Sequence, residues 1–175
     1  MSMFPIASYT VGVGGAASVT FSSIPQTFTH LQLRVFGQSN ANIGGFDQMA
    51  IRFSGDSAAN YTQHQIEGNG ATASSGSYTG GTYCYIGRLS DGAVSPFGVS
   101  IIDILDYANT NKNKTVKSLQ GVDLNSSGRV ALYSSLWINT SAVTSMVMIP
   151  QTAGAFQQNS RFDLYGISIS NATGA

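Results

Sequence analysis

Charge is what this chain of 175 residues has least of. Charged residues make up 9% of it, against about 25% in an ordinary soluble domain. It contains a single glutamate, Glu67, and only three lysines, Lys112, Lys114 and Lys117. Because glutamate and lysine commonly cover the exposed faces of helices, their scarcity predicts almost no helix.

Other absences exclude classes of function. Eight basic and eight acidic residues cancel, and no basic stripe with interleaved aromatic residues is present, so neither nucleic acid nor a membrane is an expected partner. The only cysteine, Cys84, excludes an internal disulfide and a zinc site built from cysteines. The N-terminal segment "MSMFPIASYT" has no signal-peptide pattern, and no run of 18 apolar residues occurs. We therefore expect a protein made in the cytoplasm, which an assembled particle could still carry out of the cell.

The residues that are abundant favour strands. The chain has 20 Gly, 9 Phe and 8 Tyr, and its polar residues are mostly Ser, Thr, Asn and Gln, a composition typical of strands joined by tight turns. Apolar and polar residues alternate with a period of two, which is typical of strands with one buried side. The clearest expected buried faces are Leu31, Leu33 and Val35; Val143, Val147 and Ile149; and Phe162 with Leu164.

About ten strand candidates follow one another between Gly, Asn, Ser or Pro clusters. Their spacing predicts an all-β fold, an antiparallel β-sandwich in one domain over residues 1–175. The segment 68–81, "GNGATASSGSYTGG", is rich in Gly, Ser and Thr, and we expect a flexible loop there. The candidate strands are 7–11, 17–24, 28–38, 47–54, 82–89, 97–107, 115–124, 129–138, 141–150 and 161–169.

The sequence does not support a nucleotide site, a metal site or a nucleophilic serine. The glycine-rich segment 12–17, "GVGGAA", precedes a strand rather than a helix, so it predicts a hairpin turn and no nucleotide site. Asp56, His64 and Glu67 are the best metal-ligand set, but His64 and Glu67 fall on opposite faces of a strand. No G-x-S-x-G sequence occurs to mark a nucleophilic serine. We expect neither a cofactor nor a metal.

Two carboxylates lie in the most apolar run of the chain, "SIIDILDYANTNKNKT" at 100–115. On a strand over 99–107, Asp103 and Asp106 point to opposite faces, so they cannot meet on one substrate bond as a glycosidase pair must. The asparagine-rich stretch after them predicts a hairpin, and the lysines expected near Asp106 at its end are Lys112, Lys114 and Lys117. We expect Asp103 to be hydrogen-bonded at a sheet rim or at a subunit contact.

A resemblance covers most of the chain. The segments "FPIASYTVGVGGAASVTFSSIPQTFTHLQLRVFGQSN", "IRFSGDSAANYTQHQIEGNG", "SIIDILDYANTNKNKTVKSLQGVDLN" and "SSLWINTSAVTSMVMIPQTAGAFQQNSRFDLYGIS" resemble small virion proteins of tailed bacteriophages. The resemblance implies a jelly-roll sandwich, found as capsid decoration (cement) proteins or in head and tail fibres. It also implies a homo-oligomer, for which we expect a trimer, and no enzyme.

The first functional hypothesis is a capsid decoration protein that stabilises the assembled head by contacting the major capsid protein or another virion protein. A shortage of charge fits this, because the cores of protein interfaces are depleted in Lys, Glu and Asp. Residues 1–8 could be a docking arm, although an ordinary edge strand is an equal alternative. The interface candidates are Met3, Phe4, Ile6, Asp103, Asp106, Lys112 and Lys114.

Two alternatives remain open. One is a fibre or knob module that binds a host-surface glycan, for which Tyr61, Tyr78, Tyr83 and Tyr85 are the candidate sugar platforms. Trp137 is expected to be a core or rim anchor. The weaker alternative is a polysaccharide hydrolase, which would need distant acidic residues to meet; the candidates are Asp47 or Asp56 with Asp163.

Overall fold

The computed structural model describes residues 1–92, 96–152 and 154–169, and over this part of the chain it consists of strands and turns without a helix. The all-β prediction is confirmed. Twelve strands are present rather than about ten, because segments 61–68 and 73–81 are also strands. Their bounds are β1 Ser2–Thr10, β2 Val19–Phe21, β3 His30–Ser39, β4 Phe46–Phe53, β5 Tyr61–Gly68, β6 Ala73–Gly81, β7 Cys84–Asp91, β8 Gly98–Ile104, β9 Lys114–Asp123, β10 Gly128–Trp137, β11 Met146–Pro150 and β12 Arg161–Ser168.

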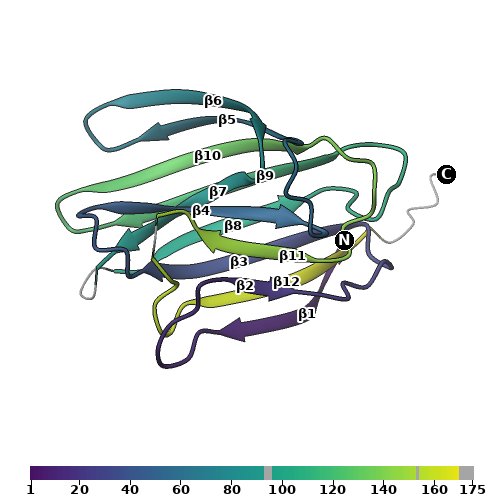
Figure 1. The fold of residues 1–175 in the computed structure, drawn as a ribbon, viewed down its shortest axis with the longest axis horizontal. Coiled ribbons are helices and arrows are strands. Elements are labelled where there is room, and N and C mark those ends of the chain that lie inside the picture. The colour runs from purple at the N-terminus through teal and green to yellow at the C-terminus, as the bar shows by residue number, and fades with distance from the viewer. Residues whose placement is uncertain (93–95, 153, 170–175) are drawn as a thin grey trace.

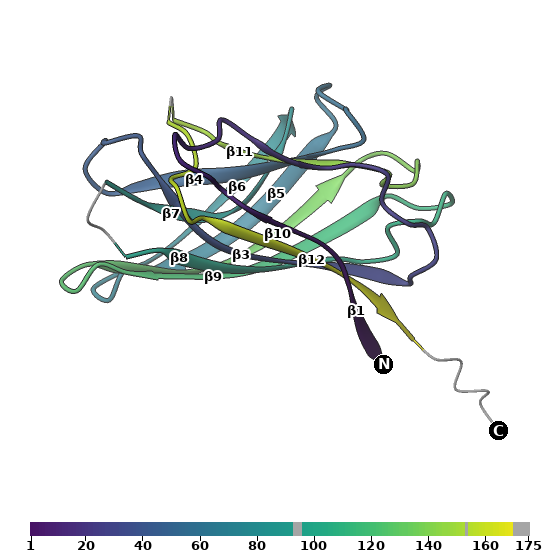
Figure 2. The same cartoon turned by 90° about the horizontal axis from the view of Figure 1, so that it is seen from below.

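The strands form one mixed sheet that folds into two layers (Figures 1 and 2). The larger layer has the order β1-β12-β3-β8-β9-β10-β5-β6, and all of its neighbours are antiparallel. The smaller layer has the order β2-β11-β4-β7, also antiparallel. A short parallel contact between β3 and β7, at Gln38↔Ser90 and Ser39↔Asp91, joins the layers.

The main core lies between the layers. Leu31, Leu33 and Val35 are buried, as are Phe162 and Leu164, so the alternation predicted for both segments is confirmed.

The buried face predicted for segment 141–150 is confirmed for Val143, which is fully buried, and is wrong for Val147 and Ile149. The buried residues of β11 are Met146 and Met148, whereas Val147 and Ile149 are only partly buried. The strand begins at Met146, and Val143 lies in the preceding loop, where its N–H donates to the carbonyl of Tyr107. The side-chain alternation therefore does not continue from Val143 into the strand.

The two glycine-rich segments have different structures. Residues 12–15 form a turn in which Gly14 and Gly15 have positive φ angles of 94° and 79°, a region that favours glycine. This turn is not the predicted hairpin, because it leads from β1 to β2, which belong to different layers. The flexible loop predicted for 68–81 is also wrong for Ala73–Gly81, which is β6 and pairs antiparallel with β5. Pairing with a neighbouring strand outweighed the weak strand propensity of Gly and Ser.

The hairpin predicted around residues 100–115 is confirmed. Strands β8 and β9 pair antiparallel from Val99↔Gly121 to Ile104↔Val116. Strand β8 ends at Ile104, so Asp106 lies in the connection, with a positive φ of 48°, and not on the strand as predicted.

Candidate functional site

The face of the larger layer that is turned away from the smaller layer, here called the outer face, carries a row of apolar side chains. Ile101 of β8 lies opposite Leu119 of β9, which lies opposite Leu132 of β10. Leu132 in turn lies opposite Ile66 of β5. Because the Cβ atoms of opposite residues on antiparallel strands are about 5 Å apart, these four side chains form a continuous row across four strands.

A second row runs beside the first. Phe36 of β3 lies opposite Val99 of β8. Across Gly121, which has no side chain, the row continues to Val130 of β10. Phe36 also stacks on Phe97, with ring centroids 4.8 Å apart. The two rows together make one apolar patch on the outer face, spanning β3, β8, β9, β10 and β5.

This patch is open to solvent. Ile66, Leu119 and Val130 are 60%, 54% and 63% exposed, and with Leu132 they line a shallow depression of about 330 Å³. Apolar surface of this kind, gathered on one face of a monomer, marks an interaction site more often than scattered exposed residues do. The patch is therefore the strongest candidate functional surface in the described residues.

Polar side chains border the patch at one end. Asp103 lies opposite Lys117 and opposite Gln32, whose Nε2 donates to Asp103 Oδ1 at 2.9 Å. Gln32 Oε1 accepts from Arg34 Nε at 3.0 Å. The prediction that Asp103 is hydrogen-bonded is confirmed, and its place on the outer face next to the patch keeps it a candidate for a subunit contact.

The connection between β8 and β9 gathers three titratable side chains. Lys112 forms an ion pair with Asp106, and the Asp106 N–H donates to His30 Nδ1 at 2.9 Å. The hydrogen bond from Lys112 is the main reason why the pKa of Asp106 lies below its usual value. Since Lys112 and Asp106 remain partly exposed, both stay interface candidates.

Lys114 is not an interface residue. It is fully buried, and its Nζ donates to the carbonyl oxygens of Asn109, Lys112 and Thr140 at 2.6, 2.7 and 3.0 Å. The prediction that Lys114 belongs to an exposed contact is wrong, because its ammonium group is buried and donates hydrogen bonds to these three carbonyls. Its role is to join the β8–β9 connection to the segment after β10.

The N-terminal candidates lie on an edge strand. β1 pairs with β12, and β12 pairs with β3 on its other side. Met3 and Phe4 are 41% and 46% exposed; Phe4 stacks on Phe28 with centroids 5.9 Å apart, and Ile6 packs against the core. The structure thus agrees with the edge-strand alternative for residues 1–8, while docking by Met3 and Phe4 stays a prediction.

Three of the four tyrosines proposed as sugar platforms cluster. Tyr78 lies on β6, Tyr83 lies between β6 and β7, and Tyr85 lies on β7. Their ring centroids are 5.2 to 6.4 Å apart, and the Arg52 guanidinium lies 5.8 Å from the centroid of the Tyr83 ring. Tyr61 does not belong to the cluster. It is fully buried, and its hydroxyl donates to the carbonyl of Asp56 at 3.0 Å, so its prediction as a sugar platform is wrong.

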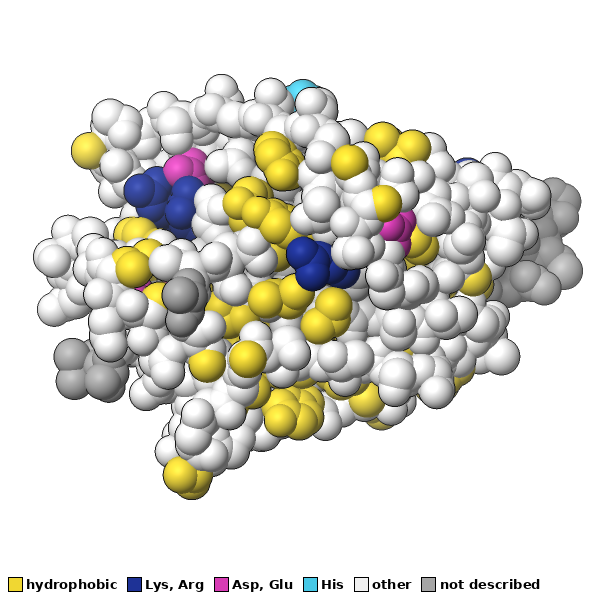
Figure 3. All heavy atoms as spheres, in the orientation of Figure 1, with side chains coloured by type: hydrophobic (Ala, Val, Ile, Leu, Met, Phe, Trp, Pro, Cys, Tyr) yellow, Lys and Arg dark blue, Asp and Glu magenta, His cyan; other side chains and the backbone are white. Residues whose placement is uncertain are grey.

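The surface around the small layer is also poor in charge. Figure 3 shows this side of the molecule, where a few basic and acidic side chains lie among hydrophobic and uncharged polar ones. The small number of charged side chains on this side agrees with the low charge content of the sequence.

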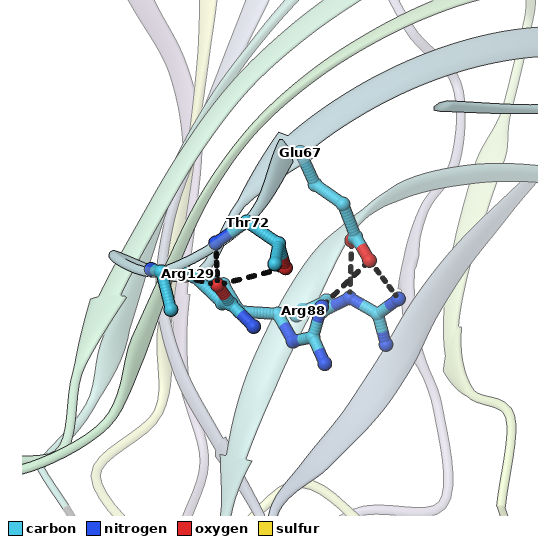
Figure 4. A network of polar contacts seen from close by, with 6 residues as sticks. Glu67, Thr72, Arg88 and Arg129 are labelled. Atoms are coloured by element: carbon cyan, nitrogen blue, oxygen red, sulfur yellow. Dashed lines mark hydrogen bonds and ion pairs between the residues drawn. The ribbon is translucent and has the colours of Figure 1, made fainter. Parts of the chain in front are cut away.

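A buried ion cluster ties the two layers together near the start of β6 (Figure 4). Glu67 of β5 binds Arg88 of β7 at 3.0 Å and Arg129 of β10 at 2.6 Å. Next to it, Asn69 Oδ1 accepts from the N–H of Thr72 at 2.8 Å and so organises the turn between β5 and β6. The cluster therefore fixes where the β5–β6 hairpin leaves the body of the protein.

A second carboxylate network holds the aromatic end of the core. Trp137 is 1% exposed, which confirms it as a core anchor, and its Nε1 donates to Asp56 Oδ2 at 2.7 Å. Asp56 also accepts from Asn60 Nδ2 and from the N–H of Ala58, each at 2.9 Å. Burial raises the pKa of Asp56, but these hydrogen bonds outweigh burial and leave it below its usual value.

The lowered pKa of Asp56 predicts a loss of stability in acid. The ionised Asp56 carboxylate contributes its full stabilisation at pH values above its pKa in the unfolded chain, which is about 3.9. This contribution is lost as the pH falls through the lower pKa that Asp56 has in the folded protein. We expect Asp56→Asn to unfold more easily than the native chain at neutral pH, and the difference to shrink below about pH 4. Urea unfolding at a series of pH values measures this. A difference that is constant from neutral pH to about pH 2 would contradict it.

The acidic residues considered for a hydrolase each have local partners. Asp47 is fully buried and accepts from Ser39 Oγ at 2.8 Å and from the Thr152 N–H at 2.9 Å. Asp163 lies on β12, where it accepts from Ser8 Oγ at 2.6 Å and Arg161 Nε at 3.0 Å. These contacts give each carboxylate a structural role.

The residues weighed as metal ligands are also engaged elsewhere. Asp56 accepts a hydrogen bond from Trp137, and Glu67 forms ion pairs with two arginines. His64 is exposed on the outer face of β5. In the described ranges, no three His, Cys, Asp or Glu side chains are grouped as metal ligands. The same ranges contain no helix long and apolar enough to cross a membrane.

Sequence reasoning missed the patch on the outer face. A signal was present: in segment 99–104 both faces are apolar, with Val99 and Ile101 on one and Ile102 and Ile104 on the other. A strand that needed only one buried side would have carried polar residues on its second face.

The comparisons with known proteins give no relative. No protein-family model, no curated protein and no solved structure matches this chain.

Proposed function

We propose that this protein is a structural protein of a tailed-bacteriophage virion, a jelly-roll sandwich that decorates the capsid and stabilises the assembled head. The observation that carries the proposal is the exposed apolar patch on the outer face. The resemblance of the sequence to small phage virion proteins is the reason why we propose a phage virion as the assembly that this protein joins. The proposal assigns the protein no reaction and no cofactor.

The patch suits adhesion to a large, rigid partner. It lies on paired strands, whose backbone hydrogen bonds hold the backbone in place, so little backbone freedom is lost when the patch is covered. Burying apolar side chains stabilises a contact by roughly 25 cal/mol for each Å² removed from water. A protein that binds only the assembled shell stabilises that shell by mass action. The major capsid protein or another virion protein is the partner that we propose for this face.

The exposed part of β1 extends this proposal. Met3 lies on the same side of the sheet as Arg34, whose Nη2 is 3.9 Å from the Met3 sulfur. Met3 would therefore add a second contact beside the patch, whereas Phe4 points to the other face of β1, where it stacks on Phe28. The resemblance implies a homo-oligomer, for which a trimer is the expected form. The edge pairing argued below would instead give a dimer, and the mass of the protein in solution decides between the two.

Binding to capsids should depend on the patch. We expect the purified protein to co-sediment saturably with mature capsids of its phage that have been stripped of accessory proteins, and not with host cells. Leu119→Ser and Val130→Ser together should weaken capsid binding at least about tenfold, because two exposed apolar side chains leave the contact. Val13→Ser is the matched control, since Val13 is 89% exposed in the turn after β1 and lies outside the patch.

Two outcomes would contradict the decoration proposal. Equal capsid binding by the Leu119→Ser/Val130→Ser variant and the native chain would remove the patch from the contact. Absence of saturable capsid binding by the native chain would remove the decoration role itself.

The tyrosine cluster favours a second candidate function, a knob that binds a host-surface glycan. Tyr78 is 38% exposed, and aromatic rings beside Arg52 and Gln63 resemble the combination of apolar faces and polar groups that sugars require. Binding to host cells that is competed by their surface glycans, and lost in Tyr78→Ala and Tyr83→Ala, would support this role in place of decoration. It would occur on the opposite side of the molecule from the patch.

A further inference from the structure

Strand β6 is an unprotected sheet edge. It is the last strand of the larger layer and pairs with β5 on one side only. Its sequence, ASSGSYTGG, has no charged residue and no proline, and residues 73–80 are all exposed. Edge strands of monomeric proteins are usually protected by charges, prolines or bulges, because their unpaired N–H and C=O groups can pair with another chain.

The opposite edge of the same layer is protected. There β1 contains Pro5, which has no N–H to donate, and its pairing with β12 shifts register between Pro5 and Ala7. Proline and an irregular register both disfavour the addition of a further strand. The pairing of β6 with β5 also shifts register, between Tyr61 and Gln63, which places the irregularity of β6 at Thr79 and Gly80. The open and regular part of this edge is therefore residues 73–78.

The open edge is also held in position. The Glu67 cluster fixes the end of β5 to β7 and β10, and Asn69 organises the turn into β6. At the other end, the Tyr78 ring packs beside the rings of Tyr83 and Tyr85, with centroids 6.4 Å apart in both pairs. A strand anchored at both ends is ready for pairing, because little freedom is lost when a partner arrives.

We propose that β6 pairs antiparallel with β6 of a second copy of this chain, about a two-fold axis, so that the two larger layers become one continuous sheet. The second copy fits as the partner because the strand is self-complementary. Two β6 strands bring no like charges together, and the small residues from Ala73 to Ser77 allow the backbones to approach over this part of the edge. An antiparallel pair of identical strands is the two-fold contact that symmetric dimers use.

The contact would also enlarge the apolar patch. The first row of the patch ends at Ile66 of β5, and Ser75 of β6 lies opposite Ile66. In the dimer the outer faces of both copies therefore join across β6, and the two patches form one surface. The inference does not need the virion role: a protein that dimerises through β6 and ignores capsids would refute only the decoration proposal.

The test is the mass of the protein in solution, measured by sedimentation equilibrium on the full chain. One chain weighs 18.3 kDa, and we expect the native protein to have the mass of two. The variant Ser75→Lys/Ser77→Lys places lysines on the edge, where like charges on paired strands repel. It should raise the dissociation constant of the dimer at least about tenfold. The control Val13→Lys/Thr110→Lys adds the same charge at exposed positions in two turns and should stay dimeric.

Each other result overturns the inference. A native chain that is monomeric at tens of micromolar concentration has no β6 contact. A dimer or a trimer whose mass is unchanged in Ser75→Lys/Ser77→Lys is built through another surface. Far-ultraviolet circular dichroism and urea unfolding of the variant show whether its fold is intact, and β6 amides should exchange with solvent faster in the variant than in the native dimer.

Discussion

We expect Glu67→Gln to lower the free energy of unfolding by about 3 kcal/mol. This value is at the lower end of the cost of breaking a buried ion pair. The side chain of Glu67 is 9% exposed, and those of Arg88 and Arg129 are 14% and 28% exposed. Without the carboxylate, two guanidinium groups would face each other with little water to separate their charges. The partial exposure of Arg129 is the reason why the cost does not reach the upper end of the range.

Urea unfolding of a double-mutant cycle measures this effect. Arg129→Met removes one of the two cations, so Glu67→Gln/Arg129→Met should be less destabilised than the sum of the two single variants. Strict additivity would show that Glu67 and Arg129 do not interact in the folded protein. Loss of β6 protection in Glu67→Gln, measured by hydrogen exchange, would also show that the cluster holds the open edge.

Lys114→Met should lower the free energy of unfolding by a similar amount, about 3 kcal/mol. Methionine can fill the space of the lysine side chain, but it cannot donate to the carbonyls of Asn109, Lys112 and Thr140. The three hydrogen bonds are only partly buried, so water can replace part of each one. Hydrogen bonds from a charged donor contribute about 1.5–3 kcal/mol each, and the expected cost is therefore below their sum.

Lys117→Met is the matched control for this substitution. Lys117 lies on the same strand, but its side chain is on the outer face opposite Asp103, so its replacement should change stability by less than about 0.5 kcal/mol. The urea concentrations at the unfolding midpoints of Lys114→Met and Lys117→Met measure this difference in stability. Equal stability of both would mean that the three carbonyls find other donors or water when Lys114 is absent.

Much of the fold could be predicted because strand patterns are local. The alternation of Leu31, Leu33 and Val35 follows from the pleat of a strand, in which successive side chains point to opposite faces. The hairpin between β8 and β9 could be predicted from a run of turn residues between two apolar segments. Val147 and Ile149 were predicted wrongly because the same local rule was carried through a loop, where the pleat does not hold.

The candidate sites could be predicted only in part. Tyr78, Tyr83 and Tyr85 could be proposed from their chemistry, yet nothing in the sequence distinguishes them from Tyr61, which the fold buries. The sequence marks Lys114 as a charge at a hairpin end, and charges are usually exposed. Its burial depends on three carbonyls, one of which comes from residue 140 after a different strand.

The sequence by itself determined that this protein is all-β, that it is poor in charge and that its strands have buried faces, because composition and period-two alternation act within a few residues. Only the tertiary structure decided which strands are neighbours. That pairing places Ile66, Ile101 and Leu119 in one exposed row, brings Glu67 to two arginines, and leaves β6 rather than β1 as the open edge. These features depend on contacts between residues far apart in the chain, and the register of such contacts is set by the packing of the whole sheet.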